Sequence, residues 1–343
     1  MPTKSAEVVE SGITPPSKIW LKKPQLVSFV LPVFREANGI IHFGESLIAV
    51  MNNLGLGYEL LFVEDDSPDE SLDRLKELHK QYPSVVKVLS LSRRFGHQAS
   101  LAAGFEHSRG DVVICMDSDM QHPPELVPFL LWKWSEGYQL VYTRRRKQEG
   151  RGQFKELASR LFYQTINRVS EVQLEDGTAD FRLMDRLVVD ALRRFGERWL
   201  FFRGLVQWAG FRRLAVWYDA PPRFAGTSSY TWKRMLRMGT DALFTFSLFP
   251  LRLSYTVGGF ALVATFLYTL YTLIRWIVAG GEVPGYTSLV LIVSFLSGFN
   301  LICLGIVGEY VGRIHEQVKH RPLYLVKERI GFETPLTPVT VAA

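Results

Sequence analysis

The first 145 residues of the chain alternate short apolar runs with longer amphipathic segments, and this alternation strongly constrains the fold. Apolar runs of strand length occupy residues 27–33, 58–63, 85–89, 112–116 and 140–142. Between them, apolar residues recur at helical spacing in residues 40–53, 71–81 and 96–108. Strands that alternate with helices of this length are typical of a mostly parallel sheet with helices on both faces. We therefore predict an α/β fold of this type.

The apolar run at residues 112–116 ends in two carboxylates, Asp117 and Asp119, which are separated by one residue. In an open α/β sheet, ligands bind at the carboxyl ends of the strands. Two carboxylates at that edge can share one hard cation, and oxygen ligands suit Mg²⁺ or Mn²⁺ bridging substrate phosphates. An ordinary acidic turn is the alternative interpretation of this pair.

The loops after the other predicted strands add polar groups at the same edge of the sheet. They contribute Pro32, Phe34 and Glu36, then Asp65 and Asp66, then Arg93, Arg94, His97 and Gln98. A carboxylate such as Asp65 can accept hydrogen bonds from a nucleobase or a ribose hydroxyl, while a metal at Asp117 and Asp119 would neutralise a diphosphate. Together these groups predict a nucleoside-diphosphate site.

Two common phosphate-binding motifs, Gly-x-x-x-x-Gly-Lys-Ser/Thr and Gly-x-Gly-x-x-Gly, are absent from the sequence. Their absence argues against an NTPase and against a Rossmann-type dehydrogenase. A metal-held diphosphate without hydrolytic machinery fits glycosyl transfer. In that reaction the metal stabilises the leaving nucleoside diphosphate, and a carboxylate can assist the nucleophile.

Two polar segments follow the alternating region. Residues 144–160 are rich in Arg and Lys, which fits either a phosphate-gripping segment or a solvated basic surface. Residues 171–186 are interpreted as a polar insert, which includes the carboxylates Asp176, Asp180 and Asp185.

The overall charge of the chain is +6, and 47% of its residues are hydrophobic. With long apolar segments present, this basic balance favours an anionic membrane surface or phosphate ligands over nucleic acid. No nucleic-acid-binding motif is present, so we expect no nucleic-acid partner. The two cysteines, Cys115 and Cys303, lack metal-ligand spacing, which argues against a disulfide framework or a zinc site.

Residues 253–277 and 286–307 are two long apolar segments that contain a single charged residue, Arg275. Each reaches the roughly 20 residues that span a bilayer. Basic residues before the first segment and after the second predict that both flanks face the cytoplasm. Buried helices of a soluble domain are the alternative. The amphipathic residues 231–250 suit a helix in the membrane interface or, alternatively, a core helix of the soluble domain.

These patterns divide the chain into five expected parts. They are an N-terminal tail at residues 1–24, a cytoplasmic catalytic domain at 25–230, an interfacial amphipathic helix at 231–251, a two-helix transmembrane hairpin at 252–309 and a cytoplasmic C-terminal tail at 310–343. The N-terminus has no apolar core of the kind found in signal peptides, so we expect that it is not a signal peptide.

Several motifs together carry a resemblance to a known family. They are Val-Leu-Pro-Val-Phe-Arg-Glu at residues 30–36, Phe-Val-Glu-Asp-Asp-Ser at 62–67, Ser-Arg-Arg-Phe-Gly-His-Gln at 92–98, Met-Asp-Ser-Asp-Met-Gln-His-Pro-Pro at 116–124, Ala-Asp-Phe-Arg-Leu at 179–183 and Gly-Glu-Tyr-Val-Gly-Arg at 308–313. With them the chain resembles the polyprenyl-phosphate glycosyltransferases of the inverting, GT-A-fold family 2. These include dolichyl-phosphate mannose synthases and bactoprenol glucosyltransferases.

The resemblance implies a role for individual residues of this chain. It implies nucleotide contacts at Pro32, Phe34, Glu36, Asp65, Gln98, Asp117 and Ser118. It implies a metal site, for Mg²⁺ or Mn²⁺, at Asp117, Asp119 and Gln121. It places the catalytic carboxylate at Asp180, with Asp176, Asp185 or no single base as alternatives. It places the contacts with the acceptor phosphate at Arg144, Arg146, Arg160, Arg223 and Ser228.

The chain departs from the family pattern at two of these motifs. His122 stands where the family usually has Asp after the Asp-x-Asp-x-Gln segment. Asp66 stands where the family has Gly before the serine of the second-strand motif.

The resemblance implies transfer of a hexose, with UDP-glucose as first choice and GDP-mannose as second, to undecaprenyl or another polyprenyl phosphate. The reaction would take place at the cytoplasmic face of the plasma membrane, and relatives suggest a homo-oligomer, with a tetramer as one form. The Gln-x-x-Arg-Trp motif of processive synthases is absent. A membrane-anchored nucleotide-sugar binding protein and a membrane scaffold are the non-catalytic alternatives.

Overall fold

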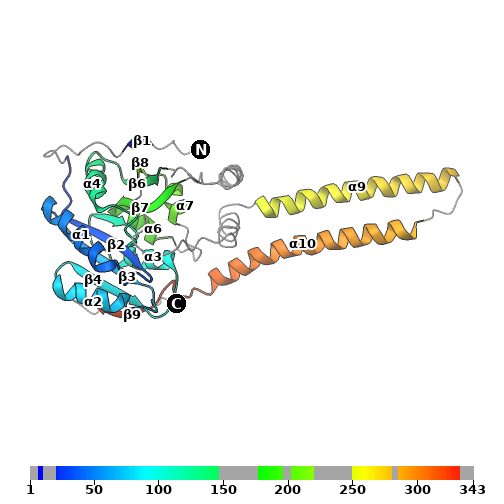
Figure 1. The fold of residues 1–343 in the computed structure, drawn as a ribbon. Helices are drawn as coiled ribbons and strands as arrows, with labels where there is room; N and C mark the ends of the chain where they lie inside the picture. The colour runs from blue at the N-terminus through cyan, green and yellow to red at the C-terminus, as the bar shows by residue number, and fades with distance from the viewer. Residues whose placement is uncertain are drawn as a thin grey trace. The chain divides into compact units, whose positions relative to one another are not determined.

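The computed structural model describes residues 7–10, 21–146, 177–195, 202–219, 249–279 and 285–332. These residues belong to two compact units (Figure 1). One contains a β-sheet with its covering helices, and the other contains two long helices. Several expectations lie outside the described residues: Arg160, Arg223, Ser228, Asp176 and most of the predicted interfacial helix at 231–251.

The sheet of the first unit has nine strands within the described residues, in the order β1-β8-β6-β7-β5-β2-β3-β4-β9. The strands are β1 (Glu7–Glu10), β2 (Leu26–Val33), β3 (Gly57–Glu64), β4 (Val86–Leu91), β5 (Val112–Cys115), β6 (Leu140–Arg145), β7 (Thr178–Asp185), β8 (Arg213–Tyr218) and β9 (Val326–Ile330). Strand β7 is antiparallel to both of its neighbours, and β9 is antiparallel to β4. All other pairs are parallel.

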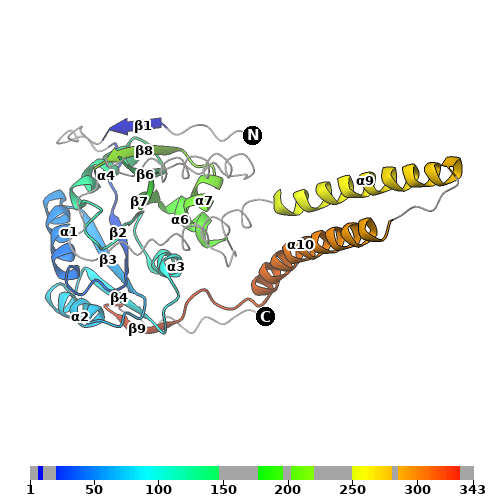
Figure 2. The ribbon, with the colours of Figure 1, turned by 45° about the vertical axis from the view of Figure 1, so that its right-hand side comes forward.

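Helices cover both faces of this sheet, as the sequence predicts (Figure 2). One face carries α1 (Ile40–Leu54), α2 (Ser71–Gln81), the short 3₁₀ helix Pro124–Leu126 and α4 (Val127–Ser135). The other face carries α3 (His97–His107), α6 (Arg186–Arg193) and α7 (Phe202–Trp208). The predicted GT-A-type α/β fold, a mostly parallel sheet between two helical layers, is therefore confirmed.

Strand β2 lies in the middle of the sheet and shows why both faces are apolar. Successive side chains of a strand point to opposite faces, so Phe29 joins the large core under α1 while Val30 faces α3. The contact with α3 depends on Gly104, because a Cβ atom there would lie 2.1 Å from a methyl carbon of Val30. Such burial on both faces explains the almost continuous apolar sequence of the strand.

The structure corrects the interpretation of residues 171–186 as a polar insert. Within that segment, Thr178–Asp185 forms strand β7, which lies between β5 and β6, and seven of its eight residues are buried. Two of the buried residues, Asp180 and Arg182, bind each other, so their charges compensate inside the sheet. In the sequence these two charged residues interrupt the apolar run, so the pattern does not indicate a buried strand.

The two expected tails also contribute strands. Glu7–Glu10 pairs in parallel with β8, and Val326–Ile330 pairs with the edge strand β4. Residues around β9 pack onto the sheet unit, and we call Tyr324–Phe332 the C-terminal strap. Its Tyr324 hydroxyl donates to Glu106 of α3, and the backbone N–H of Ser92 donates to the carbonyl of Leu325 (2.8 Å).

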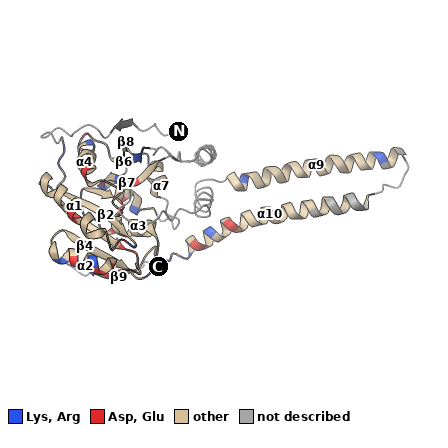
Figure 3. Cartoon of the chain, in the orientation of Figure 1, with Lys and Arg blue, Asp and Glu red and all other residues tan. Residues whose placement is uncertain are grey.

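The second unit contains α9 (Phe249–Ala279) and α10 (Tyr286–Val318), which lie side by side. Each includes a stretch long and apolar enough to cross a membrane, Phe249–Arg275 and Phe295–Val318, and none of the most apolar window of either is buried inside the structure. Figure 3 shows few charged residues along both helices. Phe260 is 79% exposed and Val278 80% exposed. Exposure of so much apolar surface indicates a lipid or protein environment, and it argues against the alternative of buried core helices.

Glu59 on β3 is a buried carboxylate that three groups of the sheet unit hold. It accepts hydrogen bonds from the Ser28 hydroxyl (2.5 Å), the Lys87 ammonium (2.7 Å) and the backbone N–H of Arg109 (2.8 Å). Burial alone would raise the pKa of Glu59, but these bonds and the charge of Lys87 outweigh burial and lower it. They therefore stabilise the folded state wherever Glu59 is ionised.

We predict that Glu59→Gln lowers the thermal midpoint of the detergent-solubilised protein by about 5–10 °C at neutral pH, because breaking a buried ion pair costs about 3 kcal/mol. Since the folded pKa is lowered, this contribution is present above the ordinary glutamate pKa of about 4.3 and is lost as the pH falls through the folded pKa. The difference from wild type should therefore shrink below about pH 4. Glu70→Gln, at an exposed pair with Arg74, is the control and should change stability by about 0.5 kcal/mol or less. A difference that stays constant across this pH range would contradict the prediction.

Candidate active site

The strand pairing brings the predicted site residues to one edge of the sheet. Strands β2, β3, β4 and β5 are parallel, so the loops after them emerge at the same edge. Strand β7 runs the other way beside β5, and Cys115 pairs with Arg182. Continuing this register by two residues sets Asp180 opposite Asp117. Asp117, a predicted metal ligand, and Asp180, the predicted catalytic carboxylate, therefore meet at this edge although they are far apart in sequence.

In the turn after β5, some side chains are partly exposed to solvent and others are buried in the interior. Asp117, Asp119 and Gln121, the predicted metal ligands, are all partly exposed, whereas Ser118 and His122 are buried beneath them. The Ser118 hydroxyl donates to the carbonyl of Pro32 (3.0 Å), which ties the turn to β2. The backbone N–H of Gln121 donates to the Asp119 carboxylate (3.1 Å).

The donor atoms of this turn fit a hard divalent cation. Asp117 and Asp119 offer carboxylate oxygens at an accessible sheet edge, and such ligands suit Mg²⁺ or Mn²⁺. Across the described residues no group of three or more His, Cys, Asp or Glu ligands converges. A cation held here would thus take its remaining ligands from a diphosphate and water, as Mg²⁺ commonly does.

Asp180 lies in the interior beside this turn, and its carboxylate is fixed by Arg182 through an Oδ1–Nη2 contact of 2.6 Å. The two side chains are 6% and 4% exposed. Below them, the Cys115 thiol donates to the backbone carbonyl of Asp180 (3.1 Å). Burial raises the pKa of Cys115 to about 12, so the thiol stays protonated.

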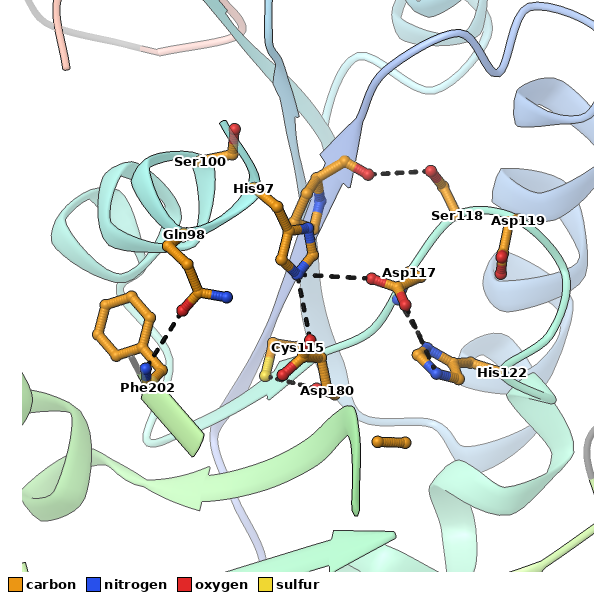
Figure 4. A network of polar contacts seen from close by, with 12 residues as sticks. His97, Gln98, Ser100, Cys115, Asp117, Ser118, Asp119, His122, Asp180 and Phe202 are labelled. Atoms are coloured by element: carbon orange, nitrogen blue, oxygen red, sulfur yellow. Dashed lines mark hydrogen bonds and ion pairs between the residues drawn. The ribbon is translucent and has the colours of Figure 1, made fainter. Parts of the chain in front are cut away.

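His97, the first residue of α3, lies between the two carboxylates (Figure 4). Its Nε2 atom is 3.4 Å from Asp180 Oδ2 and 3.7 Å from Asp117 Oδ1. The sequence motif at residues 92–98 includes His97, but nothing in its pattern reveals contact with residues of β7. His97 was expected at this edge from the sequence, and the structure adds its closeness to Asp180 together with the role of Arg182.

The predicted nucleotide-binding residues occupy the loops after β2, β3 and β4. The Phe34 ring lies under the Arg94 guanidinium, whose central carbon is 3.8 Å from the ring centroid. Asp65 accepts hydrogen bonds from the backbone N–H groups of Phe95 (2.7 Å) and Gly96 (2.8 Å). Burial is the largest influence on Asp65 and raises its pKa, although both bonds act against it. Asp65 is buried, and both of its carboxylate oxygens hold the loop after β4.

Two other predicted nucleotide contacts have partners in the protein. The backbone N–H of Glu36 donates to the Ser71 hydroxyl (3.0 Å), which joins the loop after β2 to the start of α2. The Gln98 side-chain oxygen accepts from the backbone N–H of Phe202 (3.2 Å), at the start of α7 (Figure 4). Gln98 therefore links the helix that carries His97 to α7.

The arginines at the end of β6 point in different directions. Arg145 donates to the Gln121 side-chain oxygen (3.0 Å) and to the Tyr218 hydroxyl (3.0 Å), so it lies next to the predicted metal ligands. Arg144 stacks on Trp217 (4.4 Å to the ring centroid), and Arg146 lies 3.6 Å from Asp219. The sequence analysis placed all three arginines in the basic segment at residues 144–160, but it assigned only Arg144 and Arg146 to the acceptor phosphate and gave Arg145 no role of its own. If the predicted strand had been extended from residue 142 to residue 145, side-chain alternation would have placed Arg145 on the opposite face from Arg144.

The competing carboxylate Asp185 has a structural role. Its side chain accepts hydrogen bonds from the Trp134 indole N–H (2.7 Å) and from the backbone N–H of Leu187 (3.0 Å), where it caps α6. It lies at the opposite end of β7 from Asp180, so the structure separates it from the site.

Comparison with known proteins identifies the class of this chain. Residues 28–193 match the Glycosyl transferase family 2, and residues 249–314 match the family described as GtrB C-terminal hairpin. An uncharacterized glycosyltransferase of Synechocystis is 38% identical, over 90% of this chain and 96% of that protein. The bactoprenol glucosyl transferase of Shigella phage SfV is 36% identical, over 88% of this chain and 98% of that protein.

Similarity of this degree over nearly the whole of both chains shows that the chain belongs to glycosyl transferase family 2. It is accordingly a glycosyltransferase, as the motifs predict. Among solved structures, a glucosyl-3-phosphoglycerate synthase from Mycobacterium tuberculosis is 19% identical, with a TM-score of 0.47, over 70% of this chain and 86% of that one.

We predict that Arg182→Leu destabilises the protein by about 3–5 kcal/mol, because it leaves the buried Asp180 carboxylate without its cation. Adding Asp180→Asn should recover a large part of this loss, since the uncompensated charge is then removed. Thermal unfolding of the two single variants and the double variant in detergent measures the coupling. Arg193→Leu, which breaks an exposed contact with Asp190, serves as the control. Purely additive effects of the two substitutions would show that the pair is not coupled.

Proposed function

We propose that this enzyme transfers glucose from UDP-glucose to undecaprenyl or another polyprenyl phosphate at the cytoplasmic face of the plasma membrane. The observation that carries the proposal is the meeting of Asp180 with Asp117, whose carboxylates flank His97 at 3.4 and 3.7 Å. A leaving-group site and an acceptor site thus adjoin at one sheet edge. Relatives named bactoprenol glucosyl transferase and two apolar helices support a lipid acceptor.

In this proposal the sheet edge holds the donor by its nucleotide and its diphosphate. The nucleotide contacts are Pro32, Phe34, Glu36, Asp65, Gln98, Asp117 and Ser118. Asp117, Asp119 and Gln121 would hold Mg²⁺ or Mn²⁺, and the cation would supply positive charge for the diphosphate of the donor. The Ser118 hydroxyl donates to the carbonyl of Pro32, so the nucleotide contacts at the end of β2 and in the turn after β5 are joined directly.

The acceptor phosphate attacks the anomeric carbon of the sugar through one of its oxygens. The bond from that carbon to the diphosphate oxygen breaks, UDP leaves with the electron pair, and the configuration is inverted to a β-linked product. A phosphate monoester is largely ionised near neutral pH, so the demand on a base is small. Asp180, fixed by Arg182, positions the acceptor more than it removes a proton.

The acceptor phosphate also needs cationic partners. We assign this role to Arg144 on β6, to Arg146 just after that strand, and to Arg160 and Arg223 of the segments outside the described residues, where the Ser228 hydroxyl would add a hydrogen bond. Arginine forks match phosphate oxygens in geometry and charge. A homo-oligomer, of which a tetramer is one form, belongs to the same proposal.

We predict that the purified protein with Mg²⁺ transfers radiolabelled glucose from UDP-glucose to undecaprenyl phosphate, and that Asp119→Ala and Asp180→Asn each lower this rate by at least about 100-fold. The lipid-linked product is measured after extraction into organic solvent. Glu70→Gln, at the exposed pair on α2, is the control and should keep full activity.

Each other outcome points to a different function. Product formed from GDP-mannose alone would make the enzyme a polyprenyl-phosphate mannose synthase. Binding of UDP or GDP without product from either donor would favour a membrane-anchored nucleotide-sugar binding protein. Full activity of Asp180→Asn would remove Asp180 from the mechanism.

A further inference from the structure

His122 lies directly beneath the turn that carries the predicted metal ligands. It is fully buried, with a relative exposure of 0%, and it follows Gln121 in the chain. Its Nδ1 atom accepts a hydrogen bond from the backbone N–H of Asp117 (2.7 Å). The resemblance to the family predicts an Asp at this position, so the ring is a feature of this chain that the family pattern does not explain.

The hydrogen bonding fixes where the proton of the ring sits. Because Nδ1 accepts a hydrogen bond, it carries no hydrogen, and the proton of a neutral imidazole must be on Nε2. Nε2 is 3.3 Å from the Arg145 guanidinium and 3.7 Å from Asp117 Oδ2. Arginine has only donors, so of these two neighbours only the Asp117 carboxylate could accept from Nε2–H, and at 3.7 Å the two atoms are in electrostatic contact rather than hydrogen bonded.

Packing leaves the ring little freedom to rotate. It stacks on Phe181 of β7, with ring centroids 5.2 Å apart and an interplanar angle of 26°. The Tyr218 ring of β8 lies 6.3 Å away at 66°. Arg145 of β6 binds both Tyr218 and Gln121. The imidazole is therefore held from three strands, and the turn above it rests on this support.

We propose that His122 is a positioning residue for Asp117: its Nδ1 accepts a hydrogen bond from the backbone N–H of Asp117, and its buried ring holds Nε2 3.7 Å from the carboxylate of the same residue. This sets the direction in which the carboxylate presents its oxygens to a divalent cation. The proposal rests on the proposed function only in taking the cation site to be at Asp117 and Asp119. Groups of this kind, which orient a ligand without touching the metal, typically change metal affinity 10–100-fold when removed.

Two substitutions separate the two contacts of the ring. His122→Leu keeps a buried apolar side chain of similar reach and removes both. His122→Asn keeps an amide oxygen close to the position of Nδ1, so it can still accept the Asp117 N–H, but it lacks the Nε2–H group. His79→Leu is the matched control, because the His79 ring on α2 bonds the backbone carbonyl of Val86 on β4 (2.7 Å), away from the turn.

The first measurement is Mn²⁺ binding by the full-length protein in detergent, followed by the loss of the electron paramagnetic resonance signal of free Mn²⁺. We expect His122→Leu to weaken binding at least about 10-fold, His122→Asn to recover a substantial part, and His79→Leu to match wild type. Wild-type affinity in His122→Leu would overturn the proposal. So would His122→Asn binding as weakly as His122→Leu.

The second measurement needs no metal and no substrate. Hydrogen–deuterium exchange should show slow exchange of the Asp117 amide in wild type and His122→Asn, and fast exchange in His122→Leu with the remaining sheet unchanged. Equal protection in all three proteins would overturn the proposal even if transfer of glucose is confirmed. Conversely, the expected pattern without glucose transfer would leave the role of His122 standing while the proposed reaction fails.

Discussion

The placement of β7 between β5 and β6 is the constraint on which the site depends. Because β7 is antiparallel to β5, its first residues reach the edge where the parallel strands end. Asp180 can then meet Asp117 across His97. This placement buries a carboxylate, and the ion pair with Arg182 offsets the cost of removing its charge from water. The buried ion pair between Asp180 and Arg182 therefore makes possible both the position of β7 in the sheet and the arrangement of the site.

The loop after β4 joins this site to the C-terminal strap. Phe95 and Gly96 of the loop are held by Asp65, while Phe95 also packs in a small core with Leu61, Leu89 and Tyr324. Seven residues, 319–325, separate the end of α10 from the start of β9. The chain that follows α10 thus becomes part of the packing beneath the loop after β4. Ordering of that loop and docking of the strap are expected to depend on each other.

Much of the fold could be predicted because buried parallel strands have uninterrupted apolar sequences. The strand before Asp117 is such a case, and its two carboxylates could be placed at the sheet edge from the sequence. Strand β7 could not, because Asp180 and Arg182 compensate each other only in three dimensions. Strand β9 escaped notice for another reason: as an edge strand it alternates partly buried and exposed residues, which resembles an ordinary polar tail.

The site shows the same division between local and long-range information. The sequence predicts Asp117, Asp119 and Gln121 as one group because they belong to one turn, and all three are partly exposed. The support for that turn comes from β6, β7 and β8, through Arg145, Phe181 and Tyr218. No spacing in the sequence relates these positions to His122. Residues that present oxygens to a ligand can therefore be found from local sequence, whereas residues that orient them emerge only once the strand order is known.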